Sequence, residues 1–440
     1  MFEDGGTSRR EFFKAAVAVG GATALSACVG RLGGSPETPD EPIPRGVADG
    51  STLPSRQHAW NEFCRHDEYG NVELPRHQLF VYLTLDGDAP PGPDERRTVE
   101  EALRTLDAAY ERSHRGLLSS IAYSPRYFER YGGAPAGVDL PDPRRLSDFE
   151  TPTFDRQDAL LHLASDRPDA LLEAEEALRG NRARANGVEV DAVLTDVLAV
   201  DDRRTGFVGA GMPAERQDGL NGVPESNPVP SASPLFMGFK AGFRGNQATE
   251  EYVTLREGPF AGGTTKHVAR LRQRLDDWYE EQTYDERVAE LFSPVHAAEG
   301  LVEGVGENLG ADSGLTPEMI ETIRDGAREF GRVGHAQKAA RANRDADGNV
   351  RLLRRHCEST DDDVASLHFP SLQRRISEFE AVREAMNGSD LTDVPTIRQR
   401  VNNGILEYIF VRNRGNFLVP PRALRALPTP DGEVPGLESD

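Results

Sequence analysis

Short apolar runs recur along the first half of the chain and predict the strands of a sheet. Each run is rich in β-branched, leucine or aromatic residues and is bounded by glycine, proline or charged residues, which is typical of β-strands. The runs cover residues 79–85, 117–123, 159–164 and 188–200. The third run is apolar at nearly every position, which predicts a central strand covered on both faces.

Two segments between these runs repeat their apolar positions every three or four residues, as helices do. The first covers residues 98–112, with Thr98 and Glu101 predicting a capping box at its start. The second begins near Pro168 and continues to about Leu178. The resulting order, β-α-β-β-α-β, is that of a ferredoxin-like unit, in which two helices cover one face of an antiparallel sheet.

The second half of the chain shows a looser copy of the same order. Strands are predicted near residues 264–271, 350–353, 365–369 and 417–419, and helices at 273–291 and 376–386. An insertion over 292–334 carries its own helix, which starts at Thr316. We therefore expect an α+β protein of two ferredoxin-like domains, residues 76–230 and 231–425, followed by an acidic tail over 426–440. Two facing sheets would leave a cleft between them, which is a natural position for a pocket.

The N-terminus reads as an export signal. Arg9-Arg10 precedes the small, apolar run 15–27, which is too short to span a bilayer, and Leu-Ser-Ala-Cys ends it at Cys28. These features resemble a twin-arginine signal with a lipobox, and a chance arginine pair is the alternative. We expect a signal peptide over 1–27, a lipidated Cys28, and an anchor with a flexible tether over 28–75. The protein would then be exported folded and held at the outer face of the cell membrane.

The charge balance is strongly acidic. Asp and Glu total 73 against 51 Lys and Arg, a formal net charge of −22. The lysines are few: Lys14, Lys240, Lys266 and Lys338. An acid-rich, lysine-poor composition resembles that of proteins from salt-loving microbes, and so acidic a surface argues against binding to nucleic acid. Cys64 and Cys357 allow one disulfide, but the sequence leaves open whether they pair.

Among the histidines, His335 is the one whose surroundings indicate chemistry. His77, His162 and His267 lie on or beside predicted strands, where a structural role is expected. His335 instead follows the loop Gly331-Arg332-Val333-Gly334, and the chain returns through an acidic turn to Arg354-Arg355. A histidine and an arginine that flank such a return can face one cavity. The alternative for His335 is an ordinary loop residue, and for Arg354 a surface cation.

The stretch from His335 to Arg355 resembles the haem segment of the dye-decolourising (DyP-type) peroxidases. It reads Gly-His-Ala-Gln…Ala-Asn-Arg…Leu-Leu-Arg-Arg, against His-x-Arg-x-Ala-Asn-Pro-Arg…Leu-Arg-Arg in that family. Further pieces follow in family order, at residues 124–128, 158–166, 258–265 and 415–421. The resemblance implies haem b, with His335 as the iron ligand and Arg354 on the opposite side of the haem. Arg355 takes that role if the register slips by one.

One departure from the family pattern concerns the chemistry directly. The family motif Gly-x-x-Asp-Gly corresponds here to Gly238-Phe239-Lys240-Ala241-Gly242, so Ala241 replaces the acid. Gly238 and Gly242 remain as expected cofactor-binding positions. Loss of a general acid–base group typically slows a reaction by ~10²–10⁴-fold. Water, Arg354 or an unrecognised carboxylate would then have to compensate.

The sequence therefore indicates an exported haem peroxidase in which peroxide oxidises an unknown electron donor, with activity weakened by Ala241. Two alternatives remain open. One is a non-catalytic haem- or ligand-binding lipoprotein on the same fold. The other is a protein that keeps the scaffold and binds no haem.

Overall fold

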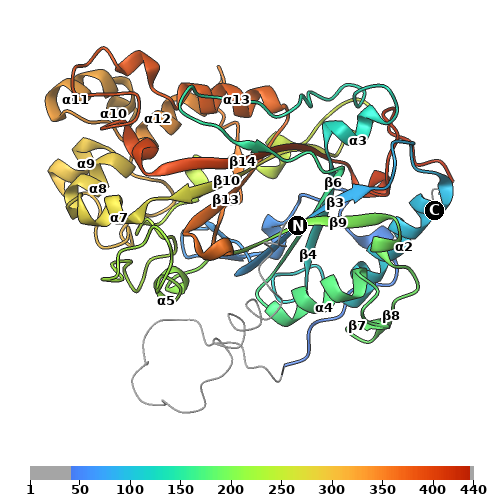
Figure 1. Cartoon of the computed structure of the whole chain (residues 1–440). Helices are drawn as coiled ribbons and strands as arrows, with labels where there is room; N and C mark the ends of the chain where they lie inside the picture. Colours follow the sequence, from blue (N-terminus) through green and yellow to red (C-terminus); the bar gives the residue numbers. More distant parts are fainter. Residues whose placement is uncertain (1–40, 437–440) are drawn as a thin grey trace, which may run out of the picture.

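The computed structural model describes residues 41–436 (Figure 1). The predicted signal peptide and Cys28 lie outside these residues. Among residues 41–436, no helix has both the length and the apolar character needed to cross a membrane. Within the same range, Cys64 and Cys357 are both buried and both free, so the structure contains no disulfide between them.

The first half of the chain forms the predicted ferredoxin-like unit. Its strands lie in the antiparallel order β9-β3-β6-β4, and two helices cover the outer face of the sheet. The elements are β3 (His77–Leu85), α2 (Pro93–Ala109), β4 (Leu118–Tyr123), β6 (Ala159–Ser165), α4 (Pro168–Leu178) and β9 (Leu198–Phe207). The short α3 (Pro125–Glu129) adds Tyr127 and Phe128 to the same core, and the hairpin of β7 (Arg184–Ala185) and β8 (Val188–Glu189) packs against α2 and α4.

The second half repeats this topology. Its sheet has the antiparallel order β12-β13-β10-β14, with β11 also on β13, which matches the order in the first unit. The strands are β10 (Thr264–Gln273), β11 (Leu353–Arg354), β12 (Cys357–Ser359), β13 (Ser366–Gln373) and β14 (Ile409–Val419). The helices are α7 (Leu275–Glu280), α8 (Tyr284–Leu291), α9 (Pro294–Glu299), α10 (Pro317–Glu321), α11 (Ile323–Phe330), α12 (His335–Ala342) and α13 (Ile376–Ala385).

The two sheets join at both edges and close into a barrel. β12 pairs with β9 through Glu358 and Phe207, and β14 pairs with β4 through Leu418 and Tyr123. The interior is packed with side chains, namely those of Phe80, Tyr82, Ala122, Leu160, Val268, Cys357, Phe417 and Val419. The prediction of a cleft between the facing sheets is therefore wrong, because closure turns that space into a filled core.

The opposite face of each sheet packs against helices. In β3, Leu79, Val81 and Leu83 belong to the core that α2 and α4 cover, while Phe80 and Tyr82 belong to the core inside the barrel. Alternate residues of a strand face opposite sides of the sheet, so each strand contributes side chains both to the barrel interior and to the core beneath the helices. This arrangement explains why the strand runs are apolar at almost every position.

Several element boundaries differ from those the pattern predicts. Helix α2 begins at Pro93, where the Glu95 carboxylate accepts from the backbone N–H of the N-cap residue Gly92, and the Thr98 hydroxyl donates to the carbonyl of Asp94 at 3.1 Å. The predicted capping box at Thr98 is therefore wrong. The fourth strand starts at Leu198, ten residues later than predicted, because 188–189 belongs to the hairpin. The helix predicted over 273–291 is two helices, since Thr283 and Glu286 form a new capping box.

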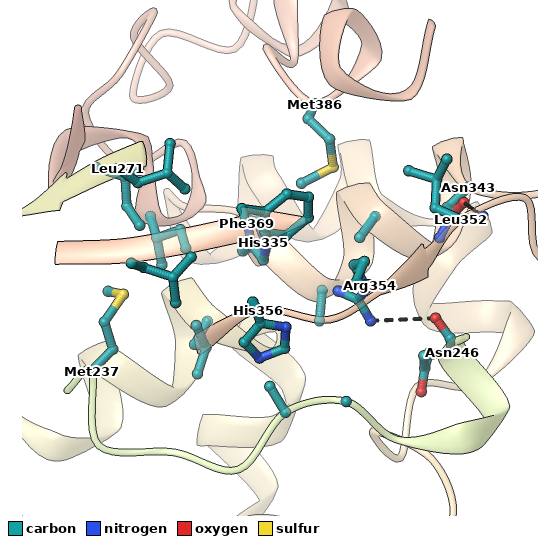
Figure 2. Close-up of a pocket in the computed structure, with 18 of the residues that line it drawn as sticks. Met237, Asn246, Leu271, His335, Asn343, Leu352, Arg354, His356, Phe369 and Met386 are labelled. Atoms are coloured by element: carbon teal, nitrogen blue, oxygen red, sulfur yellow. Dashed lines mark hydrogen bonds between the residues drawn. The ribbon is translucent and has the colours of Figure 1, made fainter. Parts of the chain in front are cut away.

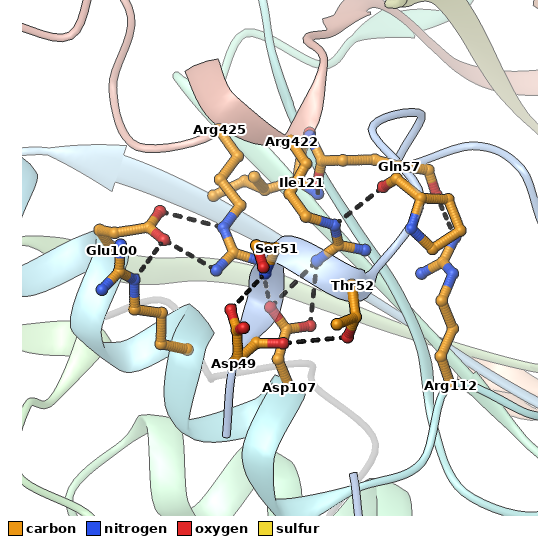
Figure 3. A network of polar contacts seen from close by, with 12 residues as sticks. Asp49, Ser51, Thr52, Gln57, Glu100, Asp107, Arg112, Ile121, Arg422 and Arg425 are labelled. Carbon is orange, nitrogen blue, oxygen red and sulfur yellow. Dashed lines mark hydrogen bonds and ion pairs between the residues drawn. The ribbon is translucent and has the colours of Figure 1, made fainter. Parts of the chain in front are cut away.

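The segment predicted as a flexible tether is partly folded onto the body. Gln57, His58 and Trp60 are buried, and β1 (Arg65–His66) pairs with β2 (Val72–Glu73). Figure 3 shows residues 49–57 beside an ion-pair cluster in which Arg422 and Arg425 both reach Asp107. Local sequence patterns do not predict this, because the contacts are long-range: Gln57 donates to the carbonyl of Pro420, and the N–H of Arg422 donates to the carbonyl of Ser55.

Candidate active site

A cavity of about 280 Å³ lies in the second unit, between the outer face of its sheet and helices α12 and α13. A loop over residues 235–246 forms its third side. Apolar side chains predominate on all sides, among them Met237, Phe239, Leu271, Leu352, Phe369 and Phe379. Ligand pockets are commonly of this kind, apolar with a few polar groups. The pocket is therefore on the helix-covered face of one sheet and not between the two sheets.

His335 faces this cavity from the first position of α12 (Figure 2). Its Nδ1 atom is buried and has no hydrogen-bond partner. Burial lowers the pKa of the imidazole to about 3, and the positive charges of Lys338 and Arg354 act in the same direction. The ring is therefore neutral at ordinary pH, which is the form that binds a metal ion.

Close backbone packing holds the start of α12 in place. Gly334 is its N-cap, and a Cβ atom there would lie 1.9 Å from the carbonyl oxygen of Phe292. The Gln337 side chain accepts from the Gly334 N–H at 3.0 Å, which closes the helix end. One turn along the helix, buried Lys338 reaches the neighbouring loop at Asn403. These contacts fix the position from which the His335 side chain enters the cavity.

Arg354 faces the same cavity from β11, on the sheet side. Its backbone N–H and Nε both donate to Oε1 of Gln247, at 3.0 and 3.3 Å. Burial lowers the pKa of the guanidinium to about 10, so it remains a cation at neutral pH. Arg355 points the other way, over the ring of Trp60 and onto Glu250. The structure thus brings together His335 and Arg354, and it separates Arg355 from them.

Two further polar residues line the cavity beside Arg354, and neither was predicted from the sequence: His356 follows β11, and Glu358 lies in β12. His356 and Glu358 follow Arg354 at intervals of two, so all three share one face, while Arg355 and Cys357 face the barrel side. The spacing of Arg354, His356 and Glu358 in the sequence predicts that they share one face of a strand. It does not predict that this face borders a pocket, because that depends on the elements that pack against β11 and β12.

Glu358 is fully engaged at the back of the cavity. It accepts from the N–H of Phe236 at 2.9 Å and lies 2.5 Å from the side-chain nitrogen of Gln273. Burial raises the pKa of this carboxyl to about 8. Glu358 is thus largely uncharged at neutral pH, and each of its oxygens lies within hydrogen-bond distance of a neighbouring nitrogen.

The motif over residues 238–242 lies on the loop side of the cavity. Ala241 and Gly242 line it, whereas Gly238 does not. Gly238 has a φ of +90°, and a Cβ there would lie 2.8 Å from the hydroxyl of Tyr279. Gly238 therefore shapes the loop, and Gly242 is the one of the two predicted glycines that borders the cavity. No carboxylate stands at position 241.

The residues of the cavity fit a flat, largely apolar cofactor with a metal at its centre. A neutral imidazole with a buried, unpartnered Nδ1 enters from one side. Small side chains on α12 and the sheet leave room beside it, namely those of Ala269, Ala336, Ala339 and Ala340. Arg344 and Arg383 also line the cavity and supply positive charge for acidic groups on such a cofactor.

Solved structures share this architecture. A dye-decolorizing peroxidase from Bacteroides thetaiotaomicron matches with a TM-score of 0.52 at 15% identity, covering 85% of this chain and 99% of its own. A putative DyP-type peroxidase from Shewanella oneidensis matches with a TM-score of 0.50 at 14% identity, over 80% and 94% of the two chains. A DypB variant from Rhodococcus jostii, solved in complex with heme, matches with 0.50 at 16% identity, over 83% and 97%.

These matches define the chain as a protein with the DyP-type peroxidase fold, and they confirm the fold inferred from the sequence. More particularly, the chain belongs to DUF7405, a family of unknown function that matches residues 75–421. No curated protein matches the chain.

Proposed function

We propose that this protein binds haem b through His335 and uses it to reduce peroxide at the expense of an electron donor. The observation that carries the proposal is the pairing of a neutral imidazole on α12 with a guanidinium on β11 across one apolar cavity. The DyP-type fold, with a neighbour solved in complex with heme, supports the choice of cofactor.

Each residue has a defined task in this proposal. His335 offers a neutral nitrogen to the iron, which imidazole binds well. Arg354 supplies a fixed positive charge, held by Gln247, where negative charge develops as peroxide reacts. The apolar walls keep bulk water away and strengthen both interactions. When bound, haem supplies the two electrons that peroxide takes up and regains them from the donor.

A haem titration of the purified protein tests the cofactor. We expect a Soret band that saturates at one haem per chain, and we expect His335→Ala to abolish it. The matched control is His66→Ala, because His66 is exposed and lies in β1, outside the cavity. Haem binding that is unchanged in His335→Ala contradicts the ligand assignment.

A second candidate is a haem-binding lipoprotein without catalysis, and Ala241 is the observation in its favour. Peroxide separates the two candidates. Rapid mixing of the haem-loaded protein with peroxide changes the Soret band of a peroxidase and leaves that of a binder unchanged. Weak activity is part of the first proposal, because no acid stands at position 241.

The cellular location is a further part of the proposal. The twin arginines at 9 and 10 and the Leu-Ser-Ala-Cys ending at Cys28 support export in the folded state and lipid anchoring. Fractionation of cells that make the full chain tests this. We expect the protein with the membrane, and we expect Cys28→Ser to release it into the medium.

A further inference from the structure

The cavity contains a second histidine that the proposed function leaves without a task. His356 lies two residues after Arg354 on the sheet side, so both side chains enter from the same wall, while His335 enters from α12 (Figure 2). The ring of His356 stacks on Phe369, with centroids 6.4 Å apart and planes at 15°. The two rings thus lie nearly parallel to each other on the sheet side of the cavity.

His356 has unused hydrogen-bonding capacity inside the cavity. Its Nδ1 atom is buried and has no partner. A buried polar atom without a partner is costly, so a molecule in the cavity that hydrogen-bonds to this ring would be favoured. Burial lowers the pKa of this imidazole to about 3, with Arg354 adding to the effect. The ring is therefore neutral in the free protein, and one of its two nitrogens carries a lone pair that can accept a hydrogen bond from a bound peroxide.

Apart from His335, the proposed iron ligand, the other acids and bases that could act in the cavity already have partners. Glu358 has partners on both oxygens, Phe236 and Gln273. Lys240 donates to Asp67 at 2.6 Å. Ala241 offers no ionisable group. His356 is thus the residue that combines a place beside Arg354 with an unpartnered ring nitrogen.

We propose that His356 is the proton-transfer residue of this cavity and takes the place of the carboxylate that is absent at Ala241. The inference rests on the proposed function, since it concerns the peroxide that reacts there. Peroxide must lose one proton to bind as the hydroperoxide anion: His356 accepts that proton and becomes imidazolium. It then returns the proton to the oxygen that departs as water, so His356 ends neutral and no proton is gained or lost overall.

The test compares His356→Leu with the unmodified protein, each loaded with haem. Leucine fills similar space but carries no proton acceptor. We expect an unchanged Soret band and a rate with peroxide lower by ~10²-fold or more, the typical contribution of a general acid–base group. His66→Leu, outside the cavity, is the control and should react at the original rate.

Cyanide provides a readout that involves no turnover. Hydrogen cyanide must also lose a proton to bind as the anion, so its association is slowed in His356→Leu if His356 accepts that proton. We expect a loss of ~10-fold or more in the association rate, followed by absorbance. A rate unchanged for both peroxide and cyanide overturns the proposal.

A second variant shows whether the role is proton transfer. Ala241→Asp in the His356→Leu background places a carboxylate on the loop side of the same cavity, and we expect it to recover at least ~10-fold of the lost peroxide rate. If His356→Leu instead converts a six-coordinate spectrum into a five-coordinate one, His356 is an iron ligand and the proposal is wrong. If the unmodified protein binds no haem at all, the proposed function itself fails, which is distinguishable from either result.

Discussion

The Nζ atom of Lys338 donates hydrogen bonds of 2.7 Å to both the backbone carbonyl and the side-chain oxygen of Asn403. A third bond of 3.0 Å goes to the carbonyl of Met386, just after α13. Lys338 lies one turn after His335 on α12. One buried side chain therefore joins the helix that carries His335 to two other segments beside the cavity.

Replacing this side chain should loosen the site. In Lys338→Met the three acceptors stay buried without their donor, which we expect to cost about 2–5 kcal/mol of the free energy of unfolding. Haem retention should weaken at the same time, because α12 loses its attachment. Urea unfolding and haem titration measure the two effects. Arg97→Met removes an exposed ion pair with Asp94 and should change stability by no more than ~1 kcal/mol. Equal effects of both variants would contradict the assigned role.

Gly334 should tolerate no side chain. An added Cβ meets the carbonyl of Phe292 at 1.9 Å, so Gly334→Ala must displace the start of α12 and with it His335. We expect a loss of about 2 kcal/mol or more and at least ~10-fold weaker haem binding. Gly326→Ala is the matched control. Nothing lies within 4 Å of a Cβ there, and within helix α11 alanine should be neutral or stabilising by up to ~1 kcal/mol.

Glu358 should make stability depend on pH. Its pKa is raised from 4.5 to about 8 in the folded protein, so the folded state holds a proton that the unfolded chain releases between these values. Stability due to this group is therefore full below about pH 4.5 and falls as pH rises towards 8, by at most ~1.4 kcal/mol per unit.

Glu358→Gln should remove this dependence. Glutamine is neutral at every pH and can bond both Phe236 and Gln273, whose side-chain oxygen has no partner in the present arrangement. We expect the variant to gain stability relative to the unmodified protein by ~1 kcal/mol or more on going from pH 5 to pH 8. Chemical denaturation at several pH values measures the difference. Parallel pH profiles for the two proteins would rule out an uncharged Glu358.

The acidic surface should make folding depend on salt. With a net charge of −22, repulsion among carboxylates is screened over about 10 Å at 0.1 M salt and about 3 Å at 1 M. We expect the melting temperature to rise by about 5 °C or more over that range. Thermal melts in KCl, with sucrose as an uncharged comparison, provide the measurement. A melting temperature that salt does not move would argue against adaptation to high salt.

Much of the fold was readable from the sequence because its signals are local. The runs at 79–85, 117–123 and 159–164 became strands close to their predicted bounds. The repeated order predicted two ferredoxin-like units, and the sheet orders agree. The predicted bounds of an element differ from the observed ones where pairing with a distant segment determines them. The strand β14 extends back to Ile409, for example, because its polar residues pair along β10.

The sequence by itself determined the strand order, the doubled unit, and the nomination of His335 and Arg354, since these depend on periodicity and on a resemblance between short motifs. Only the tertiary structure decided where the pocket lies. Closure of the barrel fills the space between the sheets, so the cavity forms beneath α12 and α13. It also decided that Arg354, His356 and Glu358 face the cavity while Arg355 turns away. A strand presents its residues alternately to two sides, and which side holds a cavity depends on elements that pack against it from elsewhere in the chain.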